Sequence, residues 1–500
     1  MVKRNRFAVI VVLVGCSAVI IMLSASLWLD AKTGDAKLAA VESMPIKSTP
    51  NFHDDLLPPI PADAVFNADG SLYLDVFNRS APLGLAEWVA YAQSHSCSIK
   101  VADYLQVFRD TARWRSVGGV AASHVAREKG LMKLAEGRYT AGRGFQSPSR
   151  WPGPSGLLEP LDSVFIAAGI KSFVFLVNSK DEPLSLPLPS NGSTPTYNSG
   201  NASDVSPYLN QLDALARSPC FSRELSSAAN AHGYFLGPGS FVTQPRAIPV
   251  FSQSKTRCFW DFVVPLAGQA TVLRETHGHV NDVVAWEDKK PVLFWRGSTT
   301  SGSHSNTTNW RDFHRTRLVR WAQDLGRANP KRVFDAGIAI PDFSKSRPPP
   351  ADQFFIDVGF GAVIQCQSSV CDEIKAEYPP KTLVSFEKTC EFKYLIVVDG
   401  NTWPNRLQRY LETNSVILYN GIFIDWYIWQ LEPMVHYVPV AYDFSDLEEK
   451  MEWLMNNDDL ARKISENARA FIRQKNELTQ MQCYSGLMML EYADLYKPDL

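Results

Sequence analysis

The sequence predicts an α/β protein with a parallel sheet, and two observations support this fold class. Residues 393–406, KYLIVVDGNTWPNR, begin with an apolar run that ends in a turn, and a helix-like stretch at 407–412 and a second apolar run at 416–419 follow. Strand, turn, helix and strand in this order are typical of a βαβ unit, the connection that parallel strands require. The chain also has 500 residues, which exceeds one typical hydrophobic core, so we expect two large domains.

The composition is that of a folded globular protein. The formal net charge is -2, the hydrophobic content is 45% and the aromatic content is 11%. A chain of this composition can bury a core, which argues against a disordered protein. It has no basic excess that would attract a nucleic acid.

The amino terminus predicts a membrane anchor. Residues 7–29 carry no charge and are long enough to cross a bilayer as a helix. Lys3, Arg4 and Arg6 precede this span, so the positive-inside rule predicts that residues 1–6 are cytoplasmic and that the rest is lumenal. Small residues around Ala25 leave a cleaved signal peptide as the alternative. Both interpretations send the chain into the secretory pathway.

Glycosylation sequons and cysteines fit that route. The Asn-x-Ser/Thr sequons are at Asn78, Asn191, Asn201 and Asn306. Of eight cysteines, Cys16 lies in the apolar span. The seven others are Cys97, Cys220, Cys258, Cys366, Cys371, Cys390 and Cys483. Their odd number leaves at least one thiol free or paired between chains, and the Cys366/Cys371 spacing favours a disulfide over a metal site.

The first half of the chain is expected to contain a stem, helices and a strand. Residues 30–84 are predicted to form the stem, because most of 31–62 is polar and proline-bearing. The spacing of apolar residues predicts helices over 85–115 and 121–134. An apolar run at 172–177 predicts a strand.

The second half alternates predicted strands and helices. Apolar runs at 291–295 and 435–440 predict strands, and 309–323 predicts a helix with a basic face. A capping-box pattern at Ser445 predicts the start of another helix. Two more helices are predicted over 458–473 and 480–496.

The turn after the strand at 393–398 is a candidate phosphate site. Ligands of open α/β sheets bind beyond the carboxyl ends of the strands, where helix N-termini suit phosphate. Arg406 opens the next helix, and its guanidinium matches a diphosphate; Asp399 and Asn401 lie in the turn. These residues indicate a nucleotide or nucleotide-sugar site. In the alternative interpretation Arg406 is solvated or paired with a carboxylate, and Trp403 either stacks on a base or sugar or merely packs.

A second candidate phosphate loop follows the strand at 291–295. Gly297 would let the backbone approach a ligand closely. Ser298 and Thr299 could donate hydrogen bonds to phosphate, and Arg296 could pair with it. The alternative is an ordinary strand-to-loop turn.

No metal site is predicted. The chain contains no Asp-x-Asp sequence, and two arginines could offset the charge of a leaving group in place of a divalent ion. His277 and His279 resemble a ligand pair, but no third ligand pattern lies near them. No cofactor is expected, because a bound nucleotide-sugar would be the donor substrate.

Asp181 is the candidate catalytic residue. It follows the predicted strand at 172–177 and precedes Glu182-Pro183. A carboxylate there could act as general base on an acceptor hydroxyl. The alternative is turn chemistry, since Asp is common beside a proline-bearing loop.

Several ordered motifs resemble those of the capsule-associated-protein-10 type of glycosyltransferase, glycosyltransferase family 90. The family also contains Rumi-type protein O-glucosyltransferases and fungal β-1,2-xylosyltransferases. The resemblance covers roughly residues 232–496, with a weaker stretch near 173–183. Its motifs are His232-Gly233-Tyr234-Phe235, Phe294-Trp295-Arg296-Gly297-Ser298, Asn309-Trp310-Arg311, Arg315-x-Arg317-Leu318, Lys393-Tyr394-Leu395, Asp399-Gly400-Asn401, Glu432-Pro433, Val435-His436-Tyr437-Val438-Pro439-Val440, Ser445-Asp446-Leu447 and Cys483-Tyr484.

The resemblance implies a GT-B arrangement, in which two Rossmann-like lobes face a cleft. Residues 85–270 would form the acceptor-side lobe, 271–475 the nucleotide-sugar lobe and 476–500 a C-terminal helix. It implies an inverting, metal-independent transfer of xylose or glucose from a UDP-sugar to a glycan or protein hydroxyl. Arg296 and Arg406 would hold the diphosphate with Ser298 beside them, and Asp181 matches the position of the family's base.

One departure from the family pattern is Pro404. The family often has Trp-Ser before the Arg-bearing helix, whereas this chain has Trp403-Pro404-Asn405. Proline lacks a hydroxyl and an N–H donor. An alternative function is therefore a catalytically silent lumenal protein that binds a UDP-sugar or a glycan. The expected location is the Golgi (or ER) membrane, and the lack of a C-terminal retention signal favours the Golgi.

Overall fold

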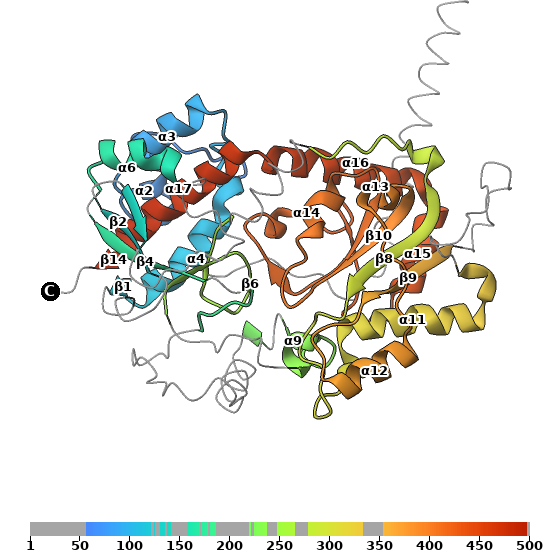
Figure 1. Cartoon of the computed structure of the whole chain (residues 1–500). Coiled ribbons are helices and arrows are strands. Elements are labelled where there is room, and N and C mark those ends of the chain that lie inside the picture. Colours follow the sequence, from blue (N-terminus) through green and yellow to red (C-terminus); the bar gives the residue numbers. More distant parts are fainter. Residues whose placement is uncertain are drawn as a thin grey trace, which may run out of the picture. The chain divides into compact units, whose positions relative to one another are not determined.

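The computed structural model describes residues 57–121, 125, 131–135, 138–141, 158–170, 172–178, 181–186, 220–221, 225–237, 248–265, 279–333 and 354–497 (Figure 1). All of them belong to one compact unit, Ser48–Leu500. The predicted tail and anchor, the sequons at Asn191 and Asn201, and His277 lie outside these residues. No helix within the described ranges is long and apolar enough to span a membrane.

A five-stranded, fully parallel sheet forms the centre of the second half. Its strand order is β13-β11-β10-β8-β9. The strands are β8 (Lys290–Ser298), β9 (Phe355–Ala362), β10 (Phe392–Val398), β11 (Val416–Asn420) and β13 (Val438–Pro439). Every residue of β11 is buried, as expected for a strand covered on both faces. The predicted parallel sheet is therefore confirmed.

Helices connect these strands and flank the sheet. They are α11 (His314–Ala328), α12 (Ser368–Glu377), α13 (Phe386–Thr389), α14 (Arg406–Leu411), α15 (Leu447–Asn456) and α16 (Asp458–Lys475). The βαβ unit predicted from residue 393 onward is β10, α14 and β11. The helix predicted over 309–323 begins later, because a 3-10 turn at Trp310–Asp312 precedes α11.

A second sheet lies in the first half of the chain, in the order β3-β2-β4-β5-β7. Its strands are β2 (Leu131–Ala135), β3 (Arg138–Ala141), β4 (Phe173–Val177), β5 (Val250–Ser252) and β7 (Phe262–Val263). The predicted strand at 172–177 is confirmed as β4. The helix predicted over 121–134 is wrong: residues 131–134 pair antiparallel with β4, and this long-range pairing overrides the local spacing.

The last helix of the chain packs with the first ones. The early helices are α2 (Ser71–Phe77), α3 (Leu85–Ser94), α4 (Leu105–Ser116) and α6 (Asp162–Ala167). Helix α17 (Leu478–Leu495) contacts α3 and α4, and the red and blue segments lie together in Figure 1. Phe66 and Tyr73, which fall in the predicted stem, are buried in the same core.

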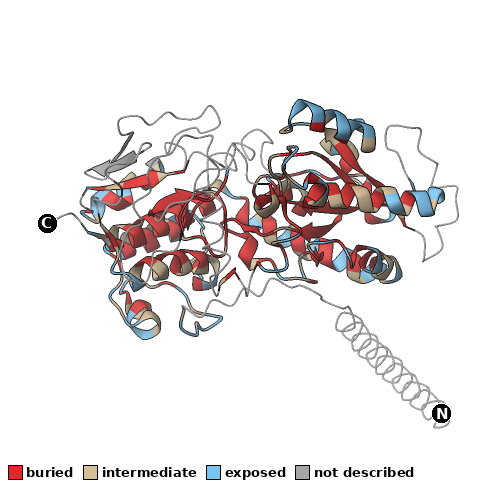
Figure 2. Cartoon of the chain, turned by 90° about the horizontal axis from the view of Figure 1, so that it is seen from below, coloured by how far each residue is buried: buried red, intermediate tan, exposed pale blue. Residues whose placement is uncertain are grey.

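Burial follows the two sheets. Figure 2 shows buried residues along most of the coloured strands and on the inner sides of the helices, with exposed residues on the outer sides of the helices. A short antiparallel ribbon, β6 (Lys255–Thr256) with β12 (Phe423–Ile424), connects the two halves. A parallel pair, β1 (Val120–Ala121) with β14 (Tyr496–Lys497), extends the contact of the chain's end with its first half.

Three disulfides join described cysteines. They are Cys97–Cys483, Cys220–Cys258 and Cys366–Cys371. The disulfide expected from the Cys366/Cys371 spacing is confirmed. Cys390 is the one free cysteine of the described residues, and it is buried.

Removing the Cys97–Cys483 disulfide is expected to destabilise the fold. The double substitution Cys97→Ala/Cys483→Ala should lower the free energy of unfolding by about 2–4 kcal/mol, because the bridge closes a very long loop in the unfolded chain. Urea unfolding without reductant measures this change. The matched control, Cys366→Ala/Cys371→Ala, opens a loop with a separation of only 5 residues, so it should cost clearly less. Equal losses for both pairs would contradict the loop-closure account.

Candidate functional site

Two arginines meet at the carboxyl edge of the parallel sheet. Arg315, the second residue of α11, donates from Nε to the Asp399 carbonyl (2.7 Å) and from Nη1 to the Ser298 carbonyl (2.9 Å). Arg406, the first residue of α14, donates from Nη1 to the carbonyl of Arg296. The ends of β8 and β10 therefore hold both guanidinium groups in place.

Within the described part of the chain, this pair of arginines forms no ion pair with a carboxylate. Burial and the charge of Arg406 lower the pKa of Arg315 to about 9, so it stays protonated near neutral pH. Burial also raises the pKa of the nearby Asp399 carboxyl to about 8, which leaves that group mostly neutral. The site is thus cationic and suits an anion.

Hydroxyl groups and a glycine complete this edge. Thr300 accepts a hydrogen bond from Arg315 Nη1 at 2.6 Å, and its hydroxyl lies 3.0 Å from that of Ser298. A Cβ atom at Gly400 would lie 3.1 Å from Arg315 Nη2. Glycine therefore keeps the space beside the guanidinium open. We define Arg315, Arg406, Ser298, Thr300 and Gly400 as the cationic edge.

Arg296 is placed elsewhere. Its side chain is buried and forms an ion pair with Asp357 of β9 at 2.6 Å. Its other donors bind the carbonyls of Trp295, Asp357 and Thr382. Thr299 likewise bonds the backbone of Ile364 at 2.6 and 2.8 Å. Both side chains join β8 to β9 and its following loop rather than pointing to the cationic edge.

The other residues predicted at this edge also have local partners. Gly297 leaves room for the indole of Trp295, because a Cβ there would lie 2.5 Å from that ring. Trp403 donates from Nε1 to Asp425 at 2.9 Å and packs against the core, so the packing alternative describes it. Asn401 is half-buried in the turn after β10.

Asp399 and two histidines form a buried polar cluster behind the cationic edge. The Asp399 carboxyl group accepts from the amides of Ile422 (2.6 Å) and Phe423 (3.3 Å). His232 Nε2 lies 3.3 Å from the same carboxyl group without hydrogen-bond alignment. His314 stacks on His232 with ring centroids 3.8 Å apart, and its Nε2 lies 2.8 Å from the Asp399 carbonyl.

Both histidines of this cluster are neutral. Burial and the charge of Arg315 lower the pKa of His232 to about 3. Burial, His232 and Arg315 lower the pKa of His314 well below its ordinary value. Because the amides of Tyr234 and Gly233 donate to the two Nδ1 atoms, each ring carries its proton on Nε2. The cluster therefore adds no positive charge to the cationic edge. It contributes a contact to the Asp399 carbonyl, the same group that binds Arg315.

Asp181 lies at the carboxyl end of the second sheet. It is exposed, and Gln253 Nε2 donates to its Oδ1 at 3.2 Å. The strands that precede these two residues, β4 and β5, are parallel, so their carboxyl ends share one edge. Gln253 lies two residues before β6, and β6 pairs with β12, whose Phe423 amide binds Asp399. Short chain segments therefore link Asp181 to the cationic edge.

Comparison with known proteins assigns the chain to a family. The family model for glycosyl transferase family 90 matches residues 240–499, which is more than half of the chain. The chain belongs to glycosyl transferase family 90. The cationic edge, the β6–β12 ribbon and α17 all lie within the matched residues, whereas Asp181 and His232 precede them.

Several relatives of this family 90 chain are named protein O-glucosyltransferases. Protein O-glucosyltransferase 2 of Danio rerio is 34% identical over 277 residues, which are 52% of this chain and 47% of that protein. Protein O-glucosyltransferase 1 of Homo sapiens is 26% identical over 265 residues, 49% of this chain and 57% of that protein. O-glucosyltransferase rumi of Drosophila pseudoobscura pseudoobscura is 28% identical over 259 residues, 49% and 55% of the two chains. The chain thus spans about half the length of the curated relatives it matches.

Sequence reasoning missed Arg315. It noted a basic face on the helix, with arginines at 311, 315, 317 and 320, but it did not single one out. Its position in the sequence could have identified it as a candidate site residue. Arg315 lies in the first turn of a helix that follows a strand, as Arg406 does. The same rule that singled out Arg406 therefore applies to Arg315.

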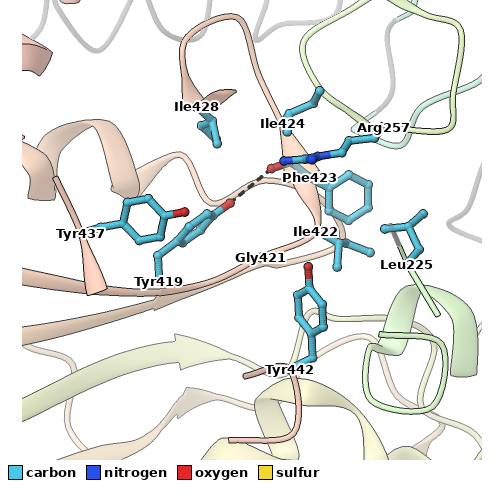
Figure 3. A pocket seen from close by; sticks show the side chains of 10 residues that line it. All are labelled: Leu225, Arg257, Tyr419, Gly421, Ile422, Phe423, Ile424, Ile428, Tyr437 and Tyr442. Atoms are coloured by element: carbon cyan, nitrogen blue, oxygen red, sulfur yellow. Dashed lines mark hydrogen bonds between the residues drawn. The ribbon is translucent and has the colours of Figure 1, made fainter. Parts of the chain in front are cut away.

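A small cavity borders the Asp399 cluster at the end of β11 (Figure 3). Figure 3 shows the Tyr419 hydroxyl directed at the Phe423 carbonyl, 3.2 Å away, with the Arg257 side chain beside Phe423. A Cβ at Gly421 would lie 2.6 Å from Asp399 Oδ1, so only glycine lets the segment pass this carboxyl group. The cavity is lined by Leu225, Arg257, Tyr419, Gly421, Ile422, Phe423, Ile424, Ile428, Tyr437 and Tyr442.

Proposed function

We propose that this chain transfers a sugar from a UDP-sugar to a hydroxyl group of a protein or glycan, with inversion and without a metal ion. The observation that supports this proposal most is the pair Arg315 and Arg406. Two guanidinium groups at the carboxyl edge of a parallel sheet, without carboxylate partners among the described residues, are suited to a diphosphate. Membership of family 90 supports glycosyl transfer as the reaction class.

In the proposed mechanism, Asp181 activates the acceptor and the arginines of the cationic edge stabilise the leaving group. Asp181 accepts the proton of the acceptor hydroxyl as its oxygen attacks the anomeric carbon of the donor. The bond from that carbon to the diphosphate oxygen breaks on the opposite face, which inverts the configuration. Arg315 and Arg406 stabilise the negative charge that develops on the departing UDP, the task that a divalent ion performs in other enzymes. In this proposal Arg296 does not bind the diphosphate. Its ion pair with Asp357 joins β8 to β9.

The donor sugar is proposed to be glucose or xylose. The relatives that are named O-glucosyltransferases make UDP-glucose the first donor to test. We further propose two Rossmann-like lobes of the GT-B type and a Golgi or ER membrane location with residues 7–29 as the anchor. The two sheets and the uncharged amino-terminal span support these points.

Replacing Asp181 tests the proposed reaction. Asp181→Asn should lower kcat by at least about a hundredfold, because a general base contributes that much, while Kd for UDP stays unchanged. UDP release from UDP-glucose and UDP-xylose, with and without a chelator, gives kcat, and calorimetry gives Kd. Asp324→Asn, an exposed carboxylate on α11, is the control with the same change of charge.

Three outcomes separate the candidates. Turnover that survives the chelator and is lost in Asp181→Asn supports the proposal. UDP binding without turnover of any donor by the wild-type chain favours the silent binding protein, for which the buried Pro404 before α14 is the structural argument. Activity that disappears with the chelator would overturn the metal-free mechanism.

A further inference from the structure

We propose that Asp261 and Lys255 are positioning residues that hold the turn carrying Asp181 at a fixed place relative to the cationic edge. This inference rests on the proposed function, in which Asp181 is the base and the two arginines bind the leaving group. The two residues contact neither the proposed substrates nor the reacting atoms. Asp261 acts through hydrogen bonds from the backbone that follows Asp181. Lys255 acts through its side-chain bonds to Asp261 and Asp110, and its main chain pairs with Ile424 of β12.

Asp261 fixes the segment that follows Asp181. Its buried carboxylate accepts from the amides of Leu184 (2.9 Å) and Ser185 (2.7 Å) and from the hydroxyl of Ser252 in β5. A carboxylate that accepts from consecutive amides determines where that backbone lies. The nearer anchored amide, that of Leu184, is therefore only three positions after Asp181.

Two further hydrogen bonds fix the same turn. The amide of Trp260 donates to the Ser185 carbonyl at 2.7 Å, and Asn178 Nδ2 donates to the Glu182 carbonyl at 2.6 Å. Asn178 also reaches the hydroxyl of Ser252, at 3.1 Å. The residues on both sides of the turn are thus joined to β5 and to the start of β7. An exposed side chain such as Asp181 gains a defined position from this buried support.

Lys255 joins Asp261 to the rest of the molecule. Its buried ammonium group donates to the Asp261 carbonyl at 2.7 Å and to the carboxylate of Asp110 in α4. Asp110 in turn accepts from the Val263 amide at 2.8 Å. Burying an ion pair is a poor source of net stability, so its clearest benefit is a unique arrangement of the groups that it joins.

Lys255 also belongs to the ribbon that leads to the arginines. It pairs with Ile424 in the β6–β12 ribbon. The amides of Ile422 and Phe423, directly before that point, donate to the Asp399 carboxyl group, and the backbone carbonyl of Asp399 accepts from Arg315. A continuous series of contacts therefore runs from the base to the cationic edge. A base must lie within hydrogen-bond reach of its proton, and a misplacement of about 1 Å can lower the rate about a hundredfold.

Asp261→Asn in the full-length chain, purified in detergent micelles, tests this inference. The new amide NH2 group cannot accept a hydrogen bond, so at least one of the two backbone contacts is lost. We expect kcat to fall about tenfold or more, with Kd for UDP unchanged within about twofold. Hydrogen exchange at the amides of Leu184 and Ser185 should become at least about tenfold faster, while Ile422 and Phe423 keep their protection.

Control variants separate positioning from loss of stability. Lys289→Met breaks a buried ion pair with Asp282 (2.8 Å). Lys289 directly precedes β8, at the end of the strand opposite to its carboxyl end, so the variant should destabilise the chain without lowering kcat. In an Asp181→Asn background, Asp261→Asn should cause no further loss of the residual rate, because it acts through Asp181. Ser252→Ala removes one donor to Asp261 and one acceptor of Asn178 and leaves both backbone contacts of Asp261 in place. It is the milder variant if Asp261→Asn does not fold, and it should lower kcat about threefold.

The outcomes distinguish this inference from the proposed function. Unchanged exchange at Leu184 and Ser185 in Asp261→Asn overturns the positioning role, whatever the activity. A further tenfold loss in the Asp181→Asn background overturns it as well, since Asp261 would then act by another route. Absence of turnover in the wild-type chain overturns the proposed function instead, and the exchange result still decides whether Asp261 anchors the turn.

Discussion

Arg315→Met is expected to reduce kcat/KM about a thousandfold and to weaken UDP binding. Each charge-assisted hydrogen bond to a phosphate contributes about 1.5–3 kcal/mol, and removal of one group that stabilises a developing oxyanion lowers kcat by about 100–1,000-fold. The loss should be large because only one of the two arginines that we place at the cationic edge, Arg406, then remains. Steady-state kinetics with the active donor and calorimetry with UDP measure the two effects.

The matched control for this variant lies on the same helix. Arg317 is two positions further along α11, and its guanidinium binds the carbonyls of Asp312 (2.7 Å) and Asn230 (2.9 Å). Arg317→Met removes the same charge from α11 but leaves the cationic edge intact, so kcat/KM should change by less than about fivefold. Equal losses in both variants would show that the general charge of the helix, and not the position of Arg315, matters.

Arg296→Met is expected to act on stability rather than on UDP binding. The substitution leaves the buried Asp357 without its closest cation, and breaking a buried ion pair in this way costs about 3–5 kcal/mol. Lys381, 2.9 Å from the same carboxylate, should keep the loss near the lower end of that range. The free energy of unfolding in urea is the quantity to measure.

Two further measurements decide the role of Arg296. The folded fraction of Arg296→Met should bind UDP with the wild-type Kd, because the side chain points into the β8–β9 contact. Arg311→Met, which removes an exposed pair with Glu377, should cost less than about 1 kcal/mol and serves as the stability control. If the Arg296→Met chain were as stable as the wild type but no longer bound UDP, Arg296 would have to be a UDP-binding residue.

The contrast between Arg296 and Arg406 shows how far sequence alone can lead. Local pattern was enough for the parallel sheet and for β10, α14 and β11, since continuous apolar runs predict strands that are buried on both faces. It also predicted the edge where Arg406 lies. It could not predict the direction of the Arg296 side chain, because the partner that holds it, Asp357, lies 61 positions away.

Long-range partners explain the other differences as well. Arg315 is one of four arginines on a basic helix, and only the packing of α11 beside the ends of β8 and β10 selects it. Residues 131–134 have helical spacing but form a strand, because β4 offers them an edge to pair with. The roles of Asp261 and Lys255 depend on contacts with Asp110 and Ser185, which no local pattern connects.

The packing of α17 against α3 and α4 has a consequence for how the chain is made. The bridged cysteines are 386 positions apart, so at a synthesis rate of about 5–20 residues per second the ribosome needs roughly 20–80 s to deliver the second one. During that interval the apolar faces of α3 and α4 lack the helix that later covers them. A translation product that stops before α17 therefore leaves those faces uncovered for good.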